Sequence, residues 1–328
     1  MSTSDGKLEP FNLIQTDYKK VGEHGIRADI LVPKAPFTGK RPVILRFHGG
    51  GLMAGDSLYL DWFPQWLLDL AQRHFAVILS PNYRFLPEAT SLDILDDIED
   101  FWTWLHSSEL ADLLSSGPAP TQLDLSRIIT AGDSAGGLLS ILLALSHPDE
   151  IRAATAAYPM LDLRSPHYST ATDKTVFSGA PRYPASTVTE HLEKMRPEDA
   201  ASPAFPPARF PLLMATFQHG RVLEFYERGS ENSPRRGLLF PIERLESEGA
   251  KLPRGGVSII HGVSDCVVPV EGSKKFVEKA REVMKGKQGG DKVVLALQEG
   301  DHGFDAGAKL DDEWLRDALK AAVEVWLE

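Results

Sequence analysis

Cysteine is almost missing from this chain, since Cys266 is the only one in 328 residues. One cysteine excludes a framework of internal disulfides and is consistent with a reducing compartment. Positive charge is also scarce: 35 Lys and Arg stand against 46 Asp and Glu, which gives a formal net charge of -11. This balance, without a long basic cluster, excludes a basic nucleic-acid-binding surface and offers anionic substrates no long-range attraction.

Long apolar runs are absent as well. No stretch reaches the ~18 residues that a membrane span requires, and residues 1–7 lack the apolar core of a signal peptide. We therefore expect a cytoplasmic protein with no membrane span. The hydrophobic content of 42% is ordinary for a globular protein, and the length suffices for one large domain or two small ones.

Short apolar segments alternate with amphipathic ones along most of the chain. The apolar segments predict strands at 43–47, 76–79, 127–131, 153–159, 257–260 and 293–297, and two weaker strands between 11 and 32. Helical spacing of apolar residues predicts helices at 59–74, 92–105, 271–284 and 313–327, and another that leaves Gly136. Because strands that alternate with helices imply βαβ crossovers, we expect an α/β fold with a mostly parallel central sheet flanked by helices.

The alternation breaks between about Arg164 and Pro253. This segment is rich in Pro, Arg, Ser and aromatic residues and contains no clear strand. It is too long for a plain connection, so we interpret it as a helical insertion. Its aromatic residues are expected either to line a substrate pocket or to form the insertion's own core: Phe177, Tyr183, Phe205, Phe210, Phe217, Phe225 and Tyr226.

A Gly-x-Ser-x-Gly pentapeptide stands between the strand predicted at 127–131 and the helix after it. It reads Gly132-Asp133-Ser134-Ala135-Gly136, and Gly137 follows. Glycines at both ends let the backbone bend sharply and let helix and strand pack closely, which exposes the serine at the end of the sheet. The pattern predicts that Ser134 is a nucleophile; the alternative is a glycine-rich turn with a capping serine.

Acyl transfer by a serine also needs a base and an acid that orients it. His302 follows the last predicted strand and is the candidate base, while Asp265 follows the preceding strand and is the candidate acid. The order Ser134, Asp265, His302 is that of α/β-hydrolases. A solvated loop histidine and a turn aspartate are the structural alternatives. Weaker candidates for the acid lie beside the base: Glu299, Asp301 and Asp305.

Donors for a developing oxyanion are expected from the glycine-rich loop His48-Gly49-Gly50-Gly51, which follows a predicted strand. Only glycines let a loop approach an oxyanion so closely. We predict that the amides of Gly49, Gly50 and Ala135 form the oxyanion hole. His48 is expected to anchor the loop through hydrogen bonds.

These blocks together resemble the hormone-sensitive-lipase-like branch of the α/β-hydrolase fold. The resemblance rests on four blocks between about 43 and 305: residues 48–51, Tyr83-Arg84-Phe85-Leu86-Pro87-Glu88, residues 132–137, and the loops of Asp265 and His302. It implies one α/β-hydrolase domain over 1–328 and a serine esterase that acts on a small or medium, mostly apolar carboxylic ester. It also implies no cofactor, no metal and a helical cap built from about 164–253, to which 1–30 would contribute.

Two positions depart from that family's pattern. Leu52 stands where the glycine loop usually continues with an aromatic residue, which predicts a reshaped acyl pocket. The acid loop, Val263 to Pro269, lacks the commoner Asp-Pro-Leu-x-Asp form. Three alternatives to an esterase therefore stay open: an amidase or formamidase, a thioesterase-type hydrolase that tailors a secondary metabolite, and a receptor-type binding module. A receptor of this branch has its histidine replaced, so His302 favours an enzyme.

Overall fold

The computed structural model describes residues 6–117, 119–171, 176, 180–196 and 199–328. Eight strands form one sheet in the order β1-β2-β4-β3-β5-β6-β7-β8. The hairpin strands are β1 (Phe11–Val21) and β2 (His24–Pro33), and β2 also pairs antiparallel with β4 (Val77–Pro81). The other pairs are parallel and involve β3 (Arg41–Phe47), β5 (Leu123–Gly132), β6 (Ile151–Ala157), β7 (Val257–Gly262) and β8 (Val293–Gln298). The predicted fold class, a mostly parallel sheet, is confirmed.

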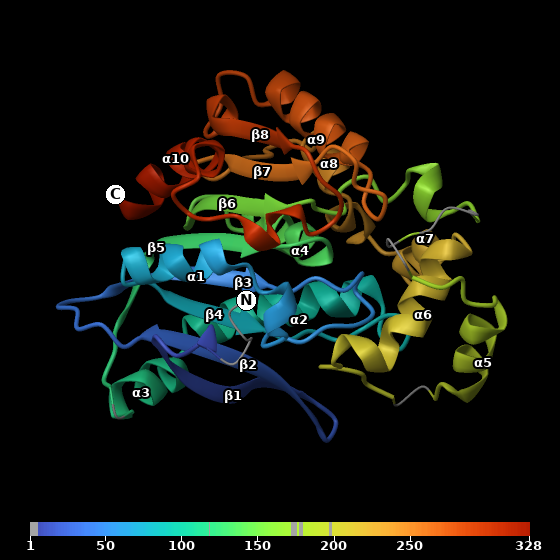
Figure 1. Ribbon diagram of the computed structural model, residues 1–328, viewed down its shortest axis with the longest axis horizontal. Coiled ribbons are helices and arrows are strands. Elements are labelled where there is room, and N and C mark those ends of the chain that lie inside the picture. The colour runs from blue at the N-terminus through green and yellow to red at the C-terminus, as the bar shows by residue number, and fades with distance from the viewer. Residues whose placement is uncertain (1–5, 118, 172–175, 177–179, 197–198) are drawn as a thin grey trace.

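Helices cover both faces of this sheet (Figure 1). One face packs against α1 (Gln65–Arg73) and α10 (Glu313–Leu327). The opposite face packs against α2 (Ser91–Leu105), α4 (Ala135–Ser146) and α9 (Val270–Val283). Successive strand residues alternate between the two cores: Ile44 belongs to the first and Leu45 to the second. Both faces are buried, which explains why the parallel strands are continuously apolar.

Two helices differ from the sequence prediction. Helix α1 begins at Gln65 rather than near 59, because Pro64 stands directly before it and residues 60–62 form only a short 3₁₀ turn. Helix α3 (Ser108–Ser116) was not predicted; the hydroxyl of Ser107 accepts a hydrogen bond from the amide of Leu110 and caps its start. None of the described helices has the length and apolar character needed to cross a bilayer.

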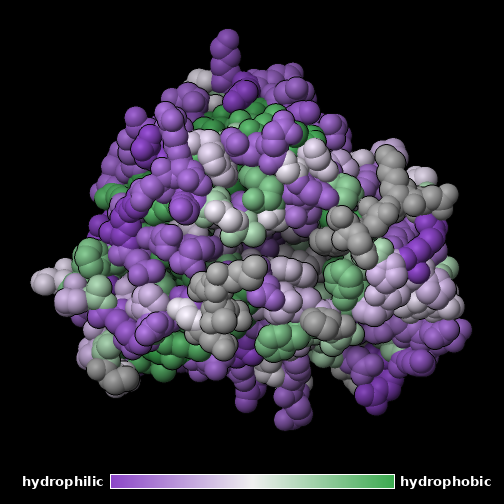
Figure 2. Space-filling model, viewed as in Figure 1, coloured by the Kyte–Doolittle hydropathy of each residue, from purple (hydrophilic) through white to green (hydrophobic). Residues whose placement is uncertain are grey.

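The insertion at 164–253 is helical in its described parts. It contains α5 (Ser186–Lys194), α6 (Pro206–Gln218), α7 (Val222–Glu227) and α8 (Pro241–Arg244). Figure 1 shows α5, α6 and α7 beyond the arrowheads of the parallel strands, at the sheet edge where open α/β folds place their sites. Figure 2 shows that this face of the molecule is largely hydrophilic, with hydrophobic residues in small separate groups.

The prediction that residues 1–30 join the cap is wrong for 11–30, because they form β1 and most of β2. Apolar residues of β2 pack in the sheet core, where Ile26 and Ile30 are completely buried. Residues 1–5 lie outside the described part of the chain. The short segment before β1 contacts the turn before α1, since Nζ of Lys7 donates to the carbonyls of Leu60 and Phe63.

Candidate active site

Ser134 stands at the turn between β5 and α4 with backbone angles φ 55° and ψ -119°. A positive φ is strained for a residue with a side chain, and such strain is typical of functional sites. Its amide donates to the carbonyl of Ala157 at 2.9 Å, which fixes the turn to the neighbouring strand β6. Gly136 is required because a Cβ there would lie 2.1 Å from the carbonyl oxygen of Phe47. The glycine pattern and the strained serine therefore have one cause, the close packing of α4 on the sheet.

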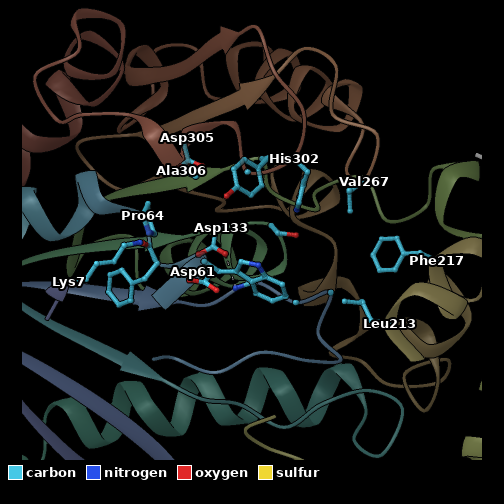
Figure 3. A pocket seen from close by; sticks show the side chains of 18 residues that line it. Lys7, Asp61, Pro64, Asp133, Leu213, Phe217, Val267, His302, Asp305 and Ala306 are labelled. Carbon is cyan, nitrogen blue, oxygen red and sulfur yellow. Dashed lines mark hydrogen bonds between the residues drawn. The ribbon is translucent and has the colours of Figure 1, made fainter. Parts of the chain in front are cut away.

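A cavity of about 330 Å³ opens beside this turn, and Ser134, His302 and residues 49–51 all line it (Figure 3). The three segments come from the ends of β5, β8 and β3. The structure thus brings together the predicted nucleophile, the predicted base and the glycine loop, although more than 80 residues of chain separate each from the next.

Asp265 accepts a hydrogen bond from Nδ1 of His302 at 2.8 Å. Its other carboxylate oxygen accepts the amides of Val267 and Val268 at 2.9 and 2.8 Å. Burial of Asp265 opposes its ionisation, but hydrogen bonds from His261 and His302 outweigh burial and hold the pKa of this carboxyl well below its ordinary value. Asp265 is therefore an ionised acceptor that fixes the orientation of the His302 ring.

The weaker candidates for the acid have other partners. Asp301 accepts hydrogen bonds from the amide of Cys266 at 2.9 Å and the amide of His302 at 2.8 Å. It therefore contacts the backbone of the predicted base, and no described hydrogen bond joins it to the imidazole ring. Asp305 accepts Nε1 of Trp66 at 2.9 Å. Glu299 is exposed. Among these acids, the described hydrogen bonds to the imidazole favour Asp265.

Sequence reasoning passed over His261, which is the second-last residue of β7. This side chain is fully buried, with Nε2 2.9 Å from the carbonyl oxygen of Val268 and 3.4 Å from Oδ2 of Asp265. The carbonyl requires a hydrogen on Nε2, and Nδ1 then accepts the hydroxyl of Ser273 at 2.8 Å. The signal in the sequence was the spacing His261-Gly262-x-x-Asp265, which lets a strand-end histidine contact the acid loop.

The glycine loop differs from the prediction at one donor. The amide of Gly49 donates a hydrogen bond to Oδ2 of Asp133 at 3.0 Å. This bond conflicts with the predicted role of Gly49 in an oxyanion hole. The amides of Gly50 and Gly51 meet no acceptor among the described residues. Ala135 opens α4, where backbone amides have no partner within the helix. Gly50 and Gly51 line the cavity, so we expect the oxyanion donors to come from Gly50, Gly51 and Ala135; the sequence prediction did not include Gly51.

His48 anchors the loop as predicted. Its Nδ1 lies 2.7 Å from the carbonyl oxygen of Gly49, so Nδ1 carries the hydrogen, and its ring stacks on Tyr83 at 4.4 Å between centroids. Burial lowers the pKa of His48 to about 4. A neutral, fully enclosed imidazole suits a structural role rather than proton transfer at neutral pH.

The cavity has two ends of different chemistry (Figure 3). Leu213 and Phe217 of α6 lie at one end with Val267, whereas Lys7 lies at the other. A Cβ on Gly51 would lie 2.4 Å from Cδ1 of Leu213, so the insertion packs directly on the glycine loop.

The aromatic residues of the insertion have different environments. Phe217 lines the cavity, whereas Phe225 and Tyr226 are buried in the hydrophobic core. Phe177 lies outside the described residues. Leu52 is buried in the same core rather than lining this cavity, so the apolar end is formed by Leu213 and Phe217 instead of a residue at 52.

A family model described as the alpha/beta hydrolase fold matches residues 44–216 of the chain. A probable carboxylesterase, M8, from Phoma sp. is 31% identical over 321 residues, which cover 94% of this chain and 95% of that relative. The chain belongs to the alpha/beta-hydrolase family.

Two further proteins resemble this hydrolase. The non-reducing polyketide synthase Preu6 of Preussia isomera is 24% identical over 350 residues, which cover 98% of this hydrolase and 15% of the synthase. The structure of Thermogutta terrifontis esterase 2 phosphonylated by sarin has a TM-score of 0.57 at 18% identity and covers 95% of this hydrolase and 93% of that chain, which shows a shared fold. The predicted resemblance to the esterase branch is confirmed, and this hydrolase is an enzyme of that branch.

Proposed function

We propose that this hydrolase cleaves a carboxylic ester of a small or medium, mostly apolar substrate through Ser134, His302 and Asp265. The main support for the proposal is the hydrogen bond from Nδ1 of His302 to Asp265 at 2.8 Å. His302 and Ser134 line the same cavity. Because Nδ1–H is donated to Asp265, Nε2 of His302 is left as the base.

In the first half of the reaction, Nε2 of His302 takes the proton of Ser134 as Oγ attacks the ester carbonyl carbon. The carbonyl oxygen becomes an oxyanion, which the amides of Gly50, Gly51 and Ala135 stabilise. The carbon–oxygen bond to the alcohol then breaks, and the leaving alcohol takes the proton from His302. The acyl group stays on Oγ as an ester.

In the second half, water replaces the alcohol. His302 takes a proton from this water as its oxygen attacks the acyl carbon, and the same amides hold the second oxyanion. The bond to Oγ breaks, Ser134 recovers its proton from His302, and the carboxylic acid leaves. Asp265 stays ionised throughout, because its lowered pKa lets it stabilise the imidazolium without taking its proton.

We also propose that the insertion at 164–253 serves as the cap of a single hydrolase domain. Leu213 and Phe217 bring α6 to the cavity wall. Arg209 of the same helix pairs with both carboxylate oxygens of Glu88 at 2.8 and 2.7 Å, which ties the helix to the segment after β4. Such a planar, two-bond pair fixes orientation as well as distance.

The test is the activity of Ser134→Ala on p-nitrophenyl butyrate. We expect kcat to fall by about three or more orders of magnitude, while circular dichroism and the melting temperature stay close to those of the wild type. Ser115→Ala, at an exposed position on α3, is the matched control and should keep full activity. Near-full activity in Ser134→Ala would show that another group is the nucleophile.

A second candidate substrate is a thioester or ester of a polyketide product. It is favoured by the likeness of nearly the whole chain to a segment of a polyketide synthase. The same groups attack a thioester carbonyl, so the two candidates differ in substrate and not in residues. Rates on a matched ester, thioester and amide of butyric acid would rank them, and a preference for the amide would instead indicate an amidase.

A further inference from the structure

Lys7 brings a cationic donor to the catalytic cavity from the segment before β1. Its Nζ lies 2.8 Å from the carbonyl oxygen of Leu60 and 2.9 Å from that of Phe63. These bonds use two of the three ammonium protons and hold the group in place, because the two carbonyls belong to the turn before α1. No other described residue accepts the third proton, and Lys7 lines the cavity that Ser134 lines.

The position of Lys7 defines a polar arm of the cavity. Figure 3 shows Lys7 at one end, Phe217 at the other, and His302 between them. Asp61 and Asp305 line the cavity on the side of Lys7, whereas Leu213 lies beside Phe217. The reacting centre therefore separates an apolar arm, formed by the insertion, from an arm that presents hydrogen-bonding groups.

The charges of the polar arm favour a neutral partner over an anion. Asp133 is compensated by Arg46, whose Nη2 lies 3.0 Å from Oδ1. The charge of Asp61 acts on Lys7, and burial raises the pKa of Asp305. A carboxylate would meet Asp61 as well as Lys7, so the ammonium alone would not favour it.

A hydroxyl group matches this arm because it both accepts and donates. Its oxygen would accept the third proton of Lys7, and its hydrogen would be donated to the carboxylate of Asp61. An alkyl group in the same place would displace water from the ammonium without replacing the lost hydrogen bond, which lowers affinity.

We propose that the polar arm recognises a hydroxyl group, alcoholic or phenolic, and that Lys7 and Asp61 are specificity-determining residues. The substrate is then an ester that carries a hydroxyl on one side of the scissile carbonyl and an apolar group on the other. This inference rests on the proposed function and narrows its substrate class.

The experiment compares two matched pairs of esters in a pH-stat, with the hydroxyl on the alcohol side or on the acyl side. The pairs are butyl butyrate with 4-hydroxybutyl butyrate, and ethyl hexanoate with ethyl 6-hydroxyhexanoate. In the wild type, kcat/KM should favour the hydroxylated ester by about tenfold in one pair, the effect of one well-placed hydrogen bond to a charged donor. Lys7→Met should reduce this ratio to about one, and Lys285→Met, at an exposed position, should leave it unchanged.

Asp61→Ala provides a second test that does not depend on the folding of the Lys7 variant, since Asp61 is exposed. It should also lower the preference for the hydroxylated ester. A wild-type ratio of about one in both pairs, or a preference that survives both Lys7→Met and Asp61→Ala, would overturn the inference. Hydrolysis of the plain esters that depends on Ser134 would still stand in that case, so the proposed function and this inference fail separately.

Discussion

The amide of Gly49 donates its hydrogen to Oδ2 of Asp133 at 3.0 Å and thereby ties the glycine loop to the residue before Ser134, the proposed nucleophile. Arg46, which is fully buried, neutralises the same carboxylate through Oδ1. Burial raises the pKa of Asp133, and Arg46 opposes this rise. One side chain therefore links the turn of Ser134 to the glycine loop, where we propose that the oxyanion donors lie.

Asp133→Ala should loosen the contact between the turn of Ser134 and the glycine loop. We expect kcat to fall by about ten- to a hundredfold with a smaller change in KM, because the lost bond positions transition-state donors. We also expect a loss of about 3 kcal/mol in the free energy of unfolding, since Arg46 is left as a buried, unpaired charge. Urea unfolding of the double variant Arg46→Met/Asp133→Asn is the control: it removes both charges and should recover part of this stability. An Asp133→Ala enzyme with unchanged kcat would contradict the positioning role.

His261→Asn should remove a hydrogen-bond donor from Asp265, the proposed acid of the triad. The substitution removes the buried ring whose Nε2 lies 3.4 Å from Oδ2 of Asp265, so Asp265 loses one of the donors that lower its pKa. We expect kcat to fall about tenfold and the acidic limb of the pH profile to shift, with KM little changed. His106→Asn, at an exposed position, should change neither quantity. A fall in kcat that accompanies a loss of folding stability, with an unshifted pH profile, would indicate that His261 has only a structural role.

Cys266 should react slowly with iodoacetamide in the wild type and faster in Asp301→Asn. Burial and the hydrogen bond to Asp301 raise the pKa of the Cys266 thiol to about 11, so little thiolate is present at pH 8. Removing the charge of Asp301 lowers that pKa and should increase the alkylation rate several-fold. The rate is measured by intact mass, with Cys266→Ser as the unreactive control. Equal rates in both proteins would show that Asp301 does not suppress the thiol.

Because of Glu88, the folding stability should depend on pH in the acid range. Burial alone would raise the pKa of Glu88, but hydrogen bonds from His191 and Arg209 outweigh burial and lower it to about 2. Because the folded pKa lies below the ordinary value of about 4.3, the stabilisation is fully present above that value and is lost as pH falls toward 2; the difference corresponds to about 3 kcal/mol.

Urea unfolding at pH 7, 4.5 and 3 measures this contribution. Glu88→Gln should be less stable than the wild type at pH 7 and should lose less stability than the wild type between pH 4.5 and 3. Glu324→Gln, at an exposed position on α10, should follow the wild type. Parallel pH curves for wild type and Glu88→Gln would contradict the assignment.

Sequence reasoning predicted the sheet well because its signals are local. The apolar segments now seen as β3 and β7 and the amphipathic spacing of α10 could be read directly from the chain. The start of α1 was misplaced because apolar spacing continues upstream of Pro64, although the helix does not. Local patterns thus identify elements better than they locate their ends.

Site residues that belong to a local backbone pattern could be predicted from the sequence. Roles that depend on contacts between distant parts of the chain could not. Ser134 and His302, which line one cavity in the structure, are predicted from their places beside predicted strands. The local pattern predicts Gly49 as an oxyanion donor, because nothing local shows that Asp133, 84 residues away, accepts a hydrogen bond from its amide. Lys7 was equally hidden, since its approach to the turn before α1 depends on the folded chain.

Labelling with a fluorophosphonate tests the central claim most directly, because the reagent needs a serine activated by a working base. Intact-mass analysis should show one adduct per chain, and peptide mapping should place it on Ser134. Ser134→Ala should give no adduct, and His302→Ala should label at least a hundredfold more slowly. Labelling of Ser134→Ala at the wild-type rate, or an adduct mapped to another residue, would contradict the assignment of Ser134, His302 and Asp265.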